Sequence, residues 1–254
     1  MNDIKIVILG RDDMTTPIVY NYLAKQFRVS GVILEEQVSG LTVLRRRAKR
    51  LGAASALGQG LFVKLVMPLL FSAAKKRIAD IIGEKGLETT AVPTEKRTPV
   101  SSVNDDETLK TIADLRPTHI VVNGTRLIDK AVLDQLTIPI INIHLGWNPR
   151  YRGGNGGYWA LWNNDKDHCG VTVHLIDPGI DTGAILERRV IHPTSTDSFM
   201  TYPYLQLAAG LRALTERLQS GDLSTHATQN EPSLIWHHPT IWGYFWHRMI
   251  RGVK

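Results

Sequence analysis

Cysteine is almost absent from this chain. Of 254 residues only one, Cys169, carries a thiol. A single cysteine cannot close a disulfide within the chain, so the sequence does not belong with the small secreted domains that disulfides hold together. With 43% hydrophobic and 21% charged residues, the composition is that of a globular protein with a sizeable core. We expect a protein of a reducing compartment, the cytoplasm.

The first residues, MNDIKIVILGRDD, lack the marks of a signal peptide. They contain no basic region and no long apolar run that ends at a small-residue cleavage site. The apolar residues 4–9 predict a first β-strand instead. The turn after this strand contains Gly10 but no GxGxxG pattern, so it lacks the glycine-rich loop that binds phosphate groups in many nucleotide-binding folds.

Acidic residues are missing from one long segment. Between Leu44 and Ala79 the sequence has nine basic residues and no aspartate or glutamate, and the apolar stretch 51–74 contains Lys64 as its only charge. The whole chain has a net charge of +6. Lys64 and Pro68 make the stretch a poor transmembrane helix. Two interpretations remain: a helical hairpin packed on the domain, or an interfacial helix pair that holds the protein at an anionic membrane.

The remaining sequence alternates between strand-like and helix-like segments. Short apolar runs are followed by segments with apolar residues at helical spacing. This alternation predicts an α/β protein with a Rossmann-like, mostly parallel sheet and helices on both faces, with a helical insertion at about 40–85. The expected strands cover residues 4–9, 29–34, 119–124, 139–145, 170–177 and 184–193, and the expected helices cover residues 15–27, 105–117, 127–136 and 198–220.

Two polar residues end one of the buried strands. Asn142 and His144 follow an apolar run that begins at Ile138, at the carboxyl end of the strand, where α/β sheets bind their ligands. Alternate residues share one face of a strand, so the amide and the imidazole should point the same way. An amide donor beside an imidazole that moves protons suits the stabilisation of an oxyanion. The alternative is two polar residues satisfied by backbone or water.

A carboxylate follows in a turn-rich loop. Asp181 lies between Gly179 and Gly183 in the sequence DPGIDTG, directly after the expected strand 170–177. From this loop it could reach His144, favour the imidazolium form and orient the ring. Alternatively, the side chain of Asp181 only caps its own turn.

In combination these motifs resemble those of a known family. The sequence NIHLGWNPRYRG, followed by GVTVHLIDPGIDTGAIL, is similar to the catalytic core of the formyltransferases, which act on methionyl-tRNA, glycinamide ribonucleotide or amino sugars. The resemblance is close over residues 115–190 and loose over 1–35. It implies that a formyl group is transferred from the co-substrate 10-formyltetrahydrofolate to an amine, and no metal is expected. Asn142, His144 and Asp181 match the family's catalytic trio.

The resemblance also implies binding residues. The segment THIVVNGTRLIDKAVLD is similar to the family segment whose turn lines the folate pocket. The expected folate contacts are Arg126, Leu127, Ile128, Asp177 and Gly179. In the loop after the catalytic strand, glycine lets the backbone approach a ligand, arginine could meet an anion, and aromatic rings could stack on a substrate. The expected acceptor contacts are Arg150, Arg152, Gly153, Tyr158 and Trp159. The two aromatic residues also fit a helix face buried in the core.

Departures from the family pattern reduce the range of acceptors that fit this sequence. The missing glycine-rich loop counts against glycinamide ribonucleotide. The residues after Ile191 are too few for the RNA-binding domain usual in methionyl-tRNA formyltransferases, so nucleic acid is not an expected partner. After His144 the usual Ser-Leu-Leu is replaced by Gly146, Trp147 and Asn148, which predicts a different pocket wall.

We therefore expect an enzyme that formylates a small-molecule amine, namely an amino sugar carried on a nucleotide or a lipid in cell-surface polysaccharide synthesis. Residues 1–195 would form the catalytic domain, and residues 196–254 a C-terminal helix with a tryptophan-rich extension. The alternatives are a 10-formyltetrahydrofolate hydrolase, a methionyl-tRNA-type formyltransferase, and a non-catalytic protein that binds folate or sugar. Membrane contact through residues 44–79 and a homodimer are both compatible with these expectations.

Overall fold

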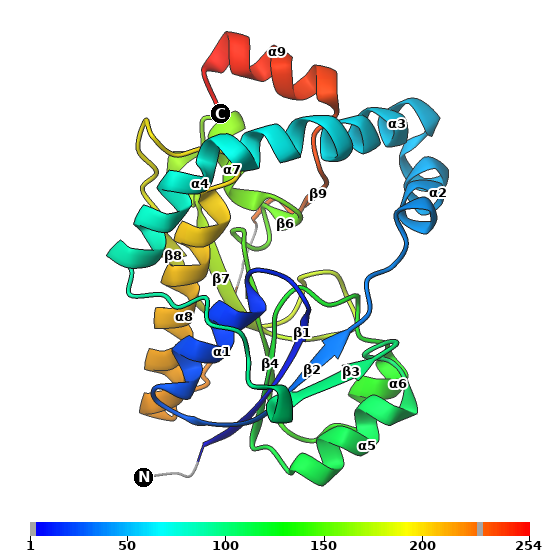
Figure 1. Ribbon diagram of the computed structural model, residues 1–254, viewed down its shortest axis with the longest axis vertical. Coiled ribbons are helices and arrows are strands. Elements are labelled where there is room, and N and C mark those ends of the chain that lie inside the picture. The colour runs from blue at the N-terminus through cyan, green and yellow to red at the C-terminus, as the bar shows by residue number, and fades with distance from the viewer. Residues whose placement is uncertain (1–3, 228–230) are drawn as a thin grey trace.

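The computed structural model describes residues 4–227 and 231–254, and a seven-stranded sheet runs through its centre (Figure 1). Its strands are β1 (Lys5–Arg11), β2 (Arg28–Glu35), β3 (Arg97–Val100), β4 (His119–Val122), β5 (Ile140–His144), β7 (Gly170–Leu175) and β8 (Ile185–Val190). Their order in the sheet is β3-β2-β1-β4-β5-β7-β8. All pairs from β3 to β5 are parallel, whereas β7 runs antiparallel to both of its neighbours. The predicted mostly parallel sheet is confirmed, with β7 as the exception.

Helices cover both faces of the sheet, as predicted, because the central strands are apolar on both sides. In β1, Ile6 and Ile8 face one core, and Val7 and Leu9 face another. The first core is covered by α1 (Thr16–Ala24), α4 (Met67–Glu84) and α8 (Tyr202–Ser220) (Figure 1). The second is covered by α5 (Asp106–Leu115) and α6 (Lys130–Leu133). Alternation with period two therefore places the central strands between two layers of helices.

The helix α8 belongs to the same core as the strands it covers. It packs on β5, β7 and β8, and its Gly210 lies so close to Ile143 and Val171 that a Cβ atom would come within 2.8 Å of both side chains. Residues on both sides of the predicted boundary at residue 195 therefore belong to one hydrophobic core.

The basic segment is helical, as predicted, but it is not a hairpin. It consists of α2 (Gly40–Leu51), α3 (Ala53–Leu61), the π-turn η1 (Phe62–Val66) and α4. The last three form one continuous helix over Ala53–Glu84, and α2 meets it at a bend, Gly52, whose φ is +86° (Figure 1). Phe62 and Ile78 of the long helix are buried in the first core, so the segment does pack on the domain.

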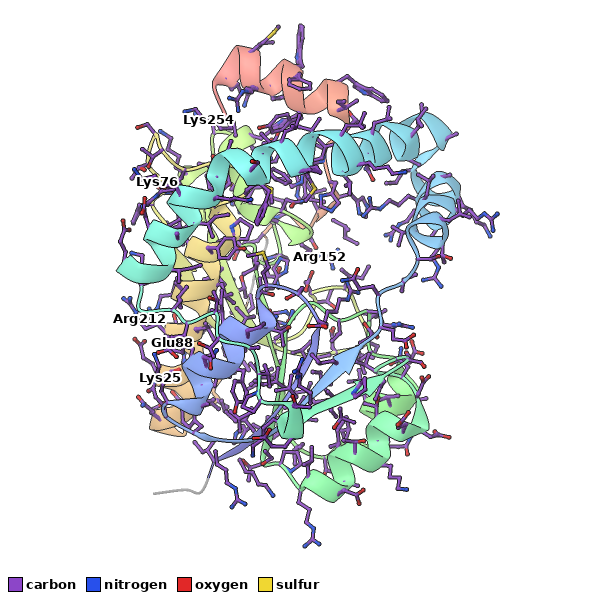
Figure 2. The ribbon with its side chains drawn as sticks, in the orientation of Figure 1. Lys25, Lys76, Glu88, Arg152, Arg212 and Lys254 are labelled. Carbon is purple, nitrogen blue, oxygen red and sulfur yellow. The ribbon has the colours of Figure 1, made fainter. Side chains whose placement is uncertain are left out.

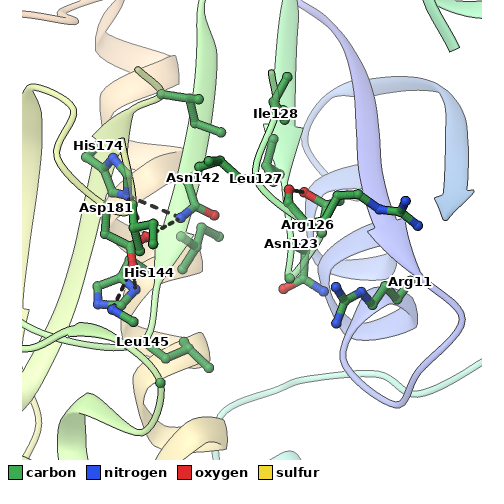
Figure 3. Close-up of a pocket in the computed structure, with 18 of the residues that line it drawn as sticks. Arg11, Asn123, Arg126, Leu127, Ile128, Asn142, His144, Leu145, His174 and Asp181 are labelled. Atoms are coloured by element: carbon green, nitrogen blue, oxygen red, sulfur yellow. Dashed lines mark hydrogen bonds and ion pairs between the residues drawn. The ribbon is translucent and has the colours of Figure 1, made fainter. Parts of the chain in front are cut away.

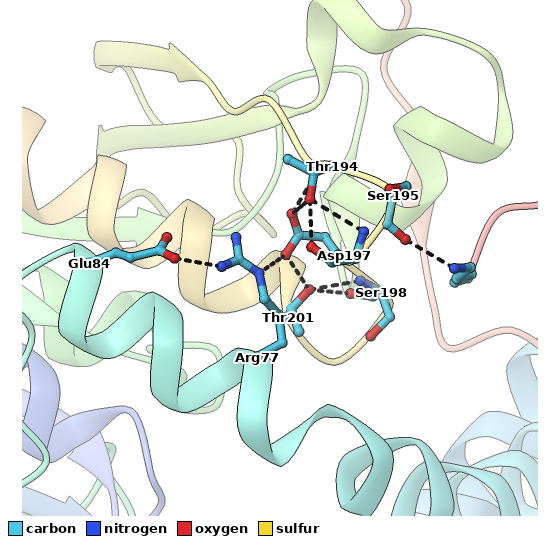
Figure 4. A network of polar contacts seen from close by, with 9 residues as sticks. Arg77, Glu84, Thr194, Ser195, Asp197, Ser198 and Thr201 are labelled. Atoms are coloured by element: carbon cyan, nitrogen blue, oxygen red, sulfur yellow. Dashed lines mark hydrogen bonds and ion pairs between the residues drawn. The ribbon is translucent and has the colours of Figure 1, made fainter.

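A polar clamp fixes α4 to the loop that precedes α8 (Figure 4). Arg77 donates from Nε to Asp197 Oδ1 at 2.9 Å and from Nη1 to Glu84 Oε1 at 2.9 Å. The Asp197 side chain is 1% exposed. It also accepts hydrogen bonds from the backbone and hydroxyl of Thr194 and from the hydroxyl of Thr201. The clamp joins residues that are 120 positions apart.

The C-terminal segment folds back onto the domain in elements that the sequence patterns did not predict. The short strand β9 (Ile235–Trp236) pairs in parallel with β6 (Arg152–Gly153). The helix α9 (Ile241–Arg251) then packs against α3 at one end of the molecule (Figure 1). The remaining elements are α7 (Gly156–Trp162) and the 3-10 turns η2 (Thr94–Lys96) and η3 (Lys166–His168).

Candidate active site

A cavity of about 600 Å³ opens at the carboxyl ends of β1, β4 and β5 (Figure 3). Arg11, Asn123 and His144 stand at these three strand ends and line it. The cavity therefore lies where the order of the parallel strands reverses, between β1 and β4, which is where open α/β sheets bind ligands.

The predicted trio meets on one wall of this cavity. Asn142 Nδ2 lies 3.4 Å from Asp181 Oδ1, and His144 Nδ1 lies 3.4 Å from Asp181 Oδ2. The Gly153 N–H donates to Asp181 Oδ2 at 2.8 Å. Asn142 and His144 thus share one face of β5, as the strand period predicts, and the loop after β7 brings the carboxylate to both of them.

The imidazole of His144 is held in one tautomer. Its Nε2 donates a hydrogen bond to the Tyr151 carbonyl at 2.8 Å, so in the neutral ring the lone pair is on Nδ1, which faces Asp181. Burial lowers the pKa of His144 below its usual 6.5, although Asp181 acts in the opposite direction. At neutral pH the ring is therefore an uncharged base whose free nitrogen stands next to a carboxylate.

Asp181 is held ionised by its neighbours. Burial alone would raise the pKa of this carboxyl, but His144, His174 and the Gly153 N–H outweigh burial and lower the pKa to about 2. The backbone is unusual as well, because Asp181 has a φ of +51° and Gly153 a φ of +85°. Aspartate tolerates this left-handed region better than most residues do, and here the conformation directs the side chain to its three partners.

His174 belongs to the site although no sequence motif marks it. Its Nε2 lies 3.1 Å from Asn142 Nδ2 and 3.6 Å from Asp181 Oδ1, while its Nδ1 lies 2.8 Å from the Leu175 carbonyl. The antiparallel register pairs His174 directly with Asn142. A histidine within the apolar run GVTVHL was the available signal, but its place beside Asn142 follows only from the unpredicted direction of β7.

The orientation of Asn142 follows from these contacts. Because Nδ1–H of His174 donates to a carbonyl, Nε2 of the neutral ring is an acceptor, and Asn142 must donate to it. The amide nitrogen of Asn142 therefore points to His174 and Asp181, and its carbonyl oxygen points into the cavity (Figure 3).

Close backbone packing supports the His144 ring. A Cβ atom at Gly146 would lie 2.5 Å from His144 Nε2 and 2.3 Å from the Tyr151 carbonyl, so only glycine leaves room for their hydrogen bond. Gly146, Trp147 and Asn148 are not among the residues that line the cavity. The prediction that this tripeptide forms a different pocket wall is therefore wrong; it supports the catalytic strand from behind.

The facing wall of the cavity is organised by a buried carboxylate. Glu35, at the end of β2, has a fully buried side chain. It accepts hydrogen bonds from the backbone N–H groups of Val103 and Arg126, and it pairs with the guanidinium groups of Arg126 and Arg11. Arg11 and Arg126 both line the cavity (Figure 3). The sequence EE directly after a buried strand was a signal that could have indicated Glu35.

All five residues that were expected to contact folate line the cavity: Arg126, Leu127, Ile128, Asp177 and Gly179. Leu127 is 48% exposed and, with the buried Ile128, gives the facing wall an apolar surface. Asp177 shapes the loop that carries Asp181, because it accepts hydrogen bonds from the Gly179 N–H and the Thr182 hydroxyl. Their binding role stays a prediction.

Of the residues that were expected to contact the acceptor, only Gly153 lines the cavity. Arg150 instead pairs with Asp165 and Glu231, and Arg152 donates to the Ile180 carbonyl. Tyr158 is 1% exposed and packs among aromatic rings, and Trp159 stacks on Trp236. For Tyr158 and Trp159 the structure supports the alternative, a buried helix face, and corrects the expectation of substrate stacking.

The N-terminus of α1 is closed by a carboxylate. Asp13 Oδ1 accepts hydrogen bonds from the backbone N–H groups of Thr15 and Thr16, at 2.8 and 3.1 Å, and from the Thr15 hydroxyl. The next residue, Pro17, has no N–H. These are the donors that would hold a phosphate at a helix N-terminus, and here a negative charge already occupies them.

The described residues, 4–227 and 231–254, contain no group of three or more histidine, cysteine or acidic side chains placed to hold a metal ion. Asn142, His144 and Asp181 form an amide, imidazole and carboxylate site that can hold and move a proton at the edge of a cavity.

A comparison with known families identifies the family of this chain. The model of the formyl transferase family matches residues 71–217, which is more than half of the chain and includes Asn142, His144 and Asp181. The chain belongs to this family. The family resemblance predicted from the two sequence motifs is thereby confirmed.

Individual proteins of the family are similar to the chain over different lengths. A methionyl-tRNA formyltransferase of Desulfotalea psychrophila is 35% identical over 120 residues, which are 47% of this chain and 37% of that protein. A sugar N-formyltransferase from a Shewanella species covers 92% of the chain and 76% of its own, with a TM-score of 0.55 and 15% identity. A phosphoribosylglycinamide formyltransferase from Streptococcus pneumoniae covers 85% and 97%, with a TM-score of 0.54 and 16% identity. At these identities the two structures show a shared fold.

Proposed function

We propose that this protein transfers a formyl group from 10-formyltetrahydrofolate to the primary amine of an amino sugar. The observation that carries the formyl transfer is the meeting of Asn142, His144 and Asp181 on one cavity wall, with Asn142 and His144 each 3.4 Å from the Asp181 carboxylate. Membership of the formyl transferase family supports the same chemistry.

The cavity suits a folate co-substrate. Its volume of about 600 Å³ falls in the usual range for ligands of this size. Leu127 and Ile128 offer an apolar surface for a flat ring, and Arg11 and Arg126 offer positive charge for the glutamate carboxylates. When bound, the folate would supply the activated formyl group; the protein would supply position and proton transfer.

The first task of the protein's own residues is to orient the amine. The carbonyl oxygen of Asn142 faces the cavity and can accept an N–H of the incoming amine, which directs the lone pair of the amine nitrogen to the formyl carbon. For Asn142 to donate to the oxyanion instead, as the sequence analysis expected, its amide must turn over and release His174. Attack forms the carbon–nitrogen bond and places negative charge on the formyl oxygen.

The second task is proton transfer. The amine loses a proton as the new bond forms, and His144 can take it at Nδ1, directly or through a water. Asp181, 3.4 Å from that nitrogen, then stabilises the imidazolium. The same proton can return to the folate nitrogen as its bond to the formyl carbon breaks, which leaves His144 neutral for the next cycle.

The acceptor is argued from the loop after β1. Asp13 occupies the N–H groups at the start of α1. A ribonucleotide phosphate would therefore lack hydrogen-bond donors there and would be repelled by the Asp13 carboxylate. This counts against glycinamide ribonucleotide. The occupied helix N-terminus therefore favours an amino sugar, and the chain shares its fold with a sugar N-formyltransferase as well as with a phosphoribosylglycinamide formyltransferase.

The test is an assay with 10-formyltetrahydrofolate and a panel of amines, with products identified by mass. The panel contains amino sugar nucleotides, lipid-linked amino sugars, glycinamide ribonucleotide and methionyl-tRNA. We expect a formylated amino sugar from the wild type and none from His144→Ala. Formylation of glycinamide ribonucleotide alone would contradict the proposed acceptor, and release of formate with every amine would indicate the hydrolase alternative.

Methionyl-tRNA is the second candidate acceptor. It is favoured by the 35% identity to a methionyl-tRNA formyltransferase over 120 residues and is compatible with the net charge of +6. Transfer to methionyl-tRNA that weakens steeply with salt, as expected when protein cations contact phosphates, would establish this candidate in place of the amino sugar.

A further inference from the structure

The helix α9 presents an apolar stripe to solvent. Its exposed large side chains recur at spacings of three and four residues, which places them on one side of the helix. They are Trp242, Phe245, Trp246, Met249 and Ile250, exposed by 53%, 49%, 58%, 77% and 58%. The opposite side of α9 is anchored, because Tyr244 is fully buried and its ring lies 5.0 Å from that of Phe62. The stripe is therefore held facing outward by a fixed helix.

The stripe continues onto α3 and the start of α4. The Trp242 ring lies directly over Gly58, where a Cβ atom would come within 2.3 Å of it, and α9 runs beside α3 (Figure 1). The long helix adds its own exposed apolar side chains: Leu57, Leu61, Val63, Leu65 and Leu69. We call these ten residues of α3, η1, α4 and α9 the apolar face. Patches of this kind mark interaction sites.

The two segments that form the apolar face contain no carboxylate. Residues 37–79 and 232–254 have no aspartate or glutamate, and they carry twelve lysines and arginines. Lys64 lies within the face, between Val63 and Leu65. Lys76 and Lys254 lie at the same end of the molecule (Figure 2). The charge of Arg50 in α2 acts on His237, which precedes α9: burial and then Arg50 lower the pKa of His237. An apolar surface bordered by cations complements a lipid bilayer with anionic headgroups.

We propose that the apolar face docks the protein onto an anionic membrane surface, with the α9 aromatic residues in the interface. This inference does not depend on the proposed function. It assigns the main contact to α9, in the tryptophan-rich tail, whose composition fits either sugar stacking or a membrane interface, and not to the basic segment 44–79 alone. Tryptophan is favoured at the boundary between headgroups and acyl chains, and two of the five stripe residues are tryptophan.

The protein lies on the membrane and does not span it. Among residues 4–227 and 231–254 one helix, Ala53–Glu84, is long and apolar enough to cross a bilayer by length and composition. However, Phe62, Val66 and Ile78 of this helix are buried in the protein core, and Arg77 is clamped to Asp197 (Figure 4). Insertion across the bilayer would break that core and the clamp, whereas docking leaves both intact.

A second copy of this chain would bind the apolar face less favourably than an anionic membrane would. Two copies that met through their apolar faces would bring their cations together, and like charges at an interface oppose association. An anionic bilayer instead attracts the cations of the face. Self-association through α9 without vesicle binding would therefore overturn the proposal.

The test is sedimentation of the full chain with vesicles, supported by tryptophan fluorescence. We expect binding to vesicles of equal amounts of phosphatidylcholine and phosphatidylglycerol, with a blue shift of the emission as Trp242 and Trp246 leave water. Binding should weaken at least about tenfold between about 0.05 and about 0.5 M salt, and be lost on pure phosphatidylcholine. A protein that stays in the supernatant with anionic vesicles at low salt refutes the proposal.

Two matched pairs of variants locate the contact. Trp246→Ser with Met249→Ser should lower the partition coefficient at least about tenfold, whereas Met14→Ser with Leu127→Ser, exposed apolar residues outside the face, should not. Arg50→Glu with Lys64→Glu should abolish binding at low salt, whereas Lys110→Glu with Lys130→Glu, the same change of charge on α5 and α6, should leave most of it. All eight positions are exposed, so folding is preserved, as circular dichroism would verify. Equal effects within either pair contradict the assignment of the face.

Discussion

At the scale of single residues, the site consists of a neutral base and a charged carboxylate that stabilise each other's roles. Burial keeps His144 uncharged, and its hydrogen bond to the Tyr151 carbonyl leaves Nδ1 free. Asp181 stays ionised in the same pocket, because the Gly153 N–H and the Asn142 amide donate to it and its pKa is lowered to about 2. When His144 takes a proton from the substrate, the positive imidazolium is balanced by the negative carboxylate of Asp181.

The trio is tested by substitution and by pH. We expect His144→Ala and Asp181→Asn each to lower turnover at least about a hundredfold, the scale of an acid–base group. The acid limb of the kcat/KM profile of the wild type should lie below pH 6.5, because burial lowers the pKa of His144. In Asp181→Asn the residual activity should extend to still lower pH, since the charge that favours imidazolium is gone. Steady-state rates between pH 4 and 9 measure both effects.

Asp181→Asn is a suitable variant because asparagine also tolerates the left-handed backbone at this position. A thermal unfolding curve should confirm that both variants are folded. A folded His144→Ala protein with nearly wild-type turnover would remove His144 from the mechanism.

His238 predicts how stability depends on pH. Burial, with Arg47 and His237 nearby, lowers the pKa of His238 to about 4, whereas in the unfolded chain the value is near 6.5. Between these values the unfolded state binds more protons, so the free energy of unfolding falls as the pH falls from 6.5 to 4. The loss from this group is at most about 3 kcal/mol. Urea unfolding of the wild type and of His238→Gln across this range should show a smaller loss in the variant.

Glutamine can preserve the hydrogen bond that His238 accepts from Asn155 but cannot take up a proton. His192→Gln, at an exposed position, controls for the removal of a histidine. Identical pH dependence in all three proteins would show that His238 does not carry the effect.

At the scale of elements, the long helix Ala53–Glu84 is attached to the domain by apolar packing and by one polar clamp. Only its buried stripe, with Phe62, Val66 and Ile78, contacts the core. Arg77 adds a polar connection to the loop before α8, where Asp197 gathers donors from both sides. The clamp thereby fixes the position of this helix relative to the sheet, although one apolar side of the helix is exposed.

Removal of the clamp should destabilise the protein. In Arg77→Ala the Asp197 carboxylate, 1% exposed, loses its guanidinium partner, and we expect the free energy of unfolding to fall by about 2 to 3 kcal/mol. Lys76→Ala removes the exposed neighbouring cation and should change it by less than about 0.5 kcal/mol. Urea titrations compare the two. Equal small effects would mean that apolar packing alone holds α4.

At the scale of the whole molecule, the cavity lies between two walls from different parts of the sheet. Arg11, Leu127 and Ile128 stand on the parallel half, and His174 and Asp181 stand on the antiparallel half. A ligand that contacts both walls must stabilise the folded protein by mass action. Binding can therefore be measured without turnover.

We expect 5-formyltetrahydrofolate, a stable folate, to raise Tm. At a hundredfold excess over Kd the stabilisation is about 2.7 kcal/mol, or roughly 5 °C or more for a chain of this length. Leu127→Asp should abolish the shift, because it places a charge on the apolar wall. Leu234→Asp, a similarly exposed leucine outside the cavity, should retain it. Loss of the shift in both variants, or in neither, would contradict the assignment of this wall.

The parts of the fold that repeat a simple pattern could be predicted from the sequence. Strands such as β1 and β5 are apolar on both faces, so their runs are visible in the sequence, and the trio followed from β5 and a glycine-rich turn. The direction of β7 could not be predicted, because an antiparallel strand buried on both sides reads like a parallel one. His174 was missed for that reason. β6, β9 and α9 were missed because two-residue strands and an outward apolar stripe depend on contacts between distant segments.

The pairing of β6 with β9 determines at which point of its synthesis the chain can complete the site. The Gly153 N–H that holds Asp181 belongs to β6, and β6 takes its place beside Trp236, 83 residues further along the chain. A nascent chain that has reached residue 220 already contains Asn142, His144, His174 and Asp181, but not the strand that fixes Gly153. Synthesis of the four site residues therefore precedes completion of the geometry around them, which requires β9.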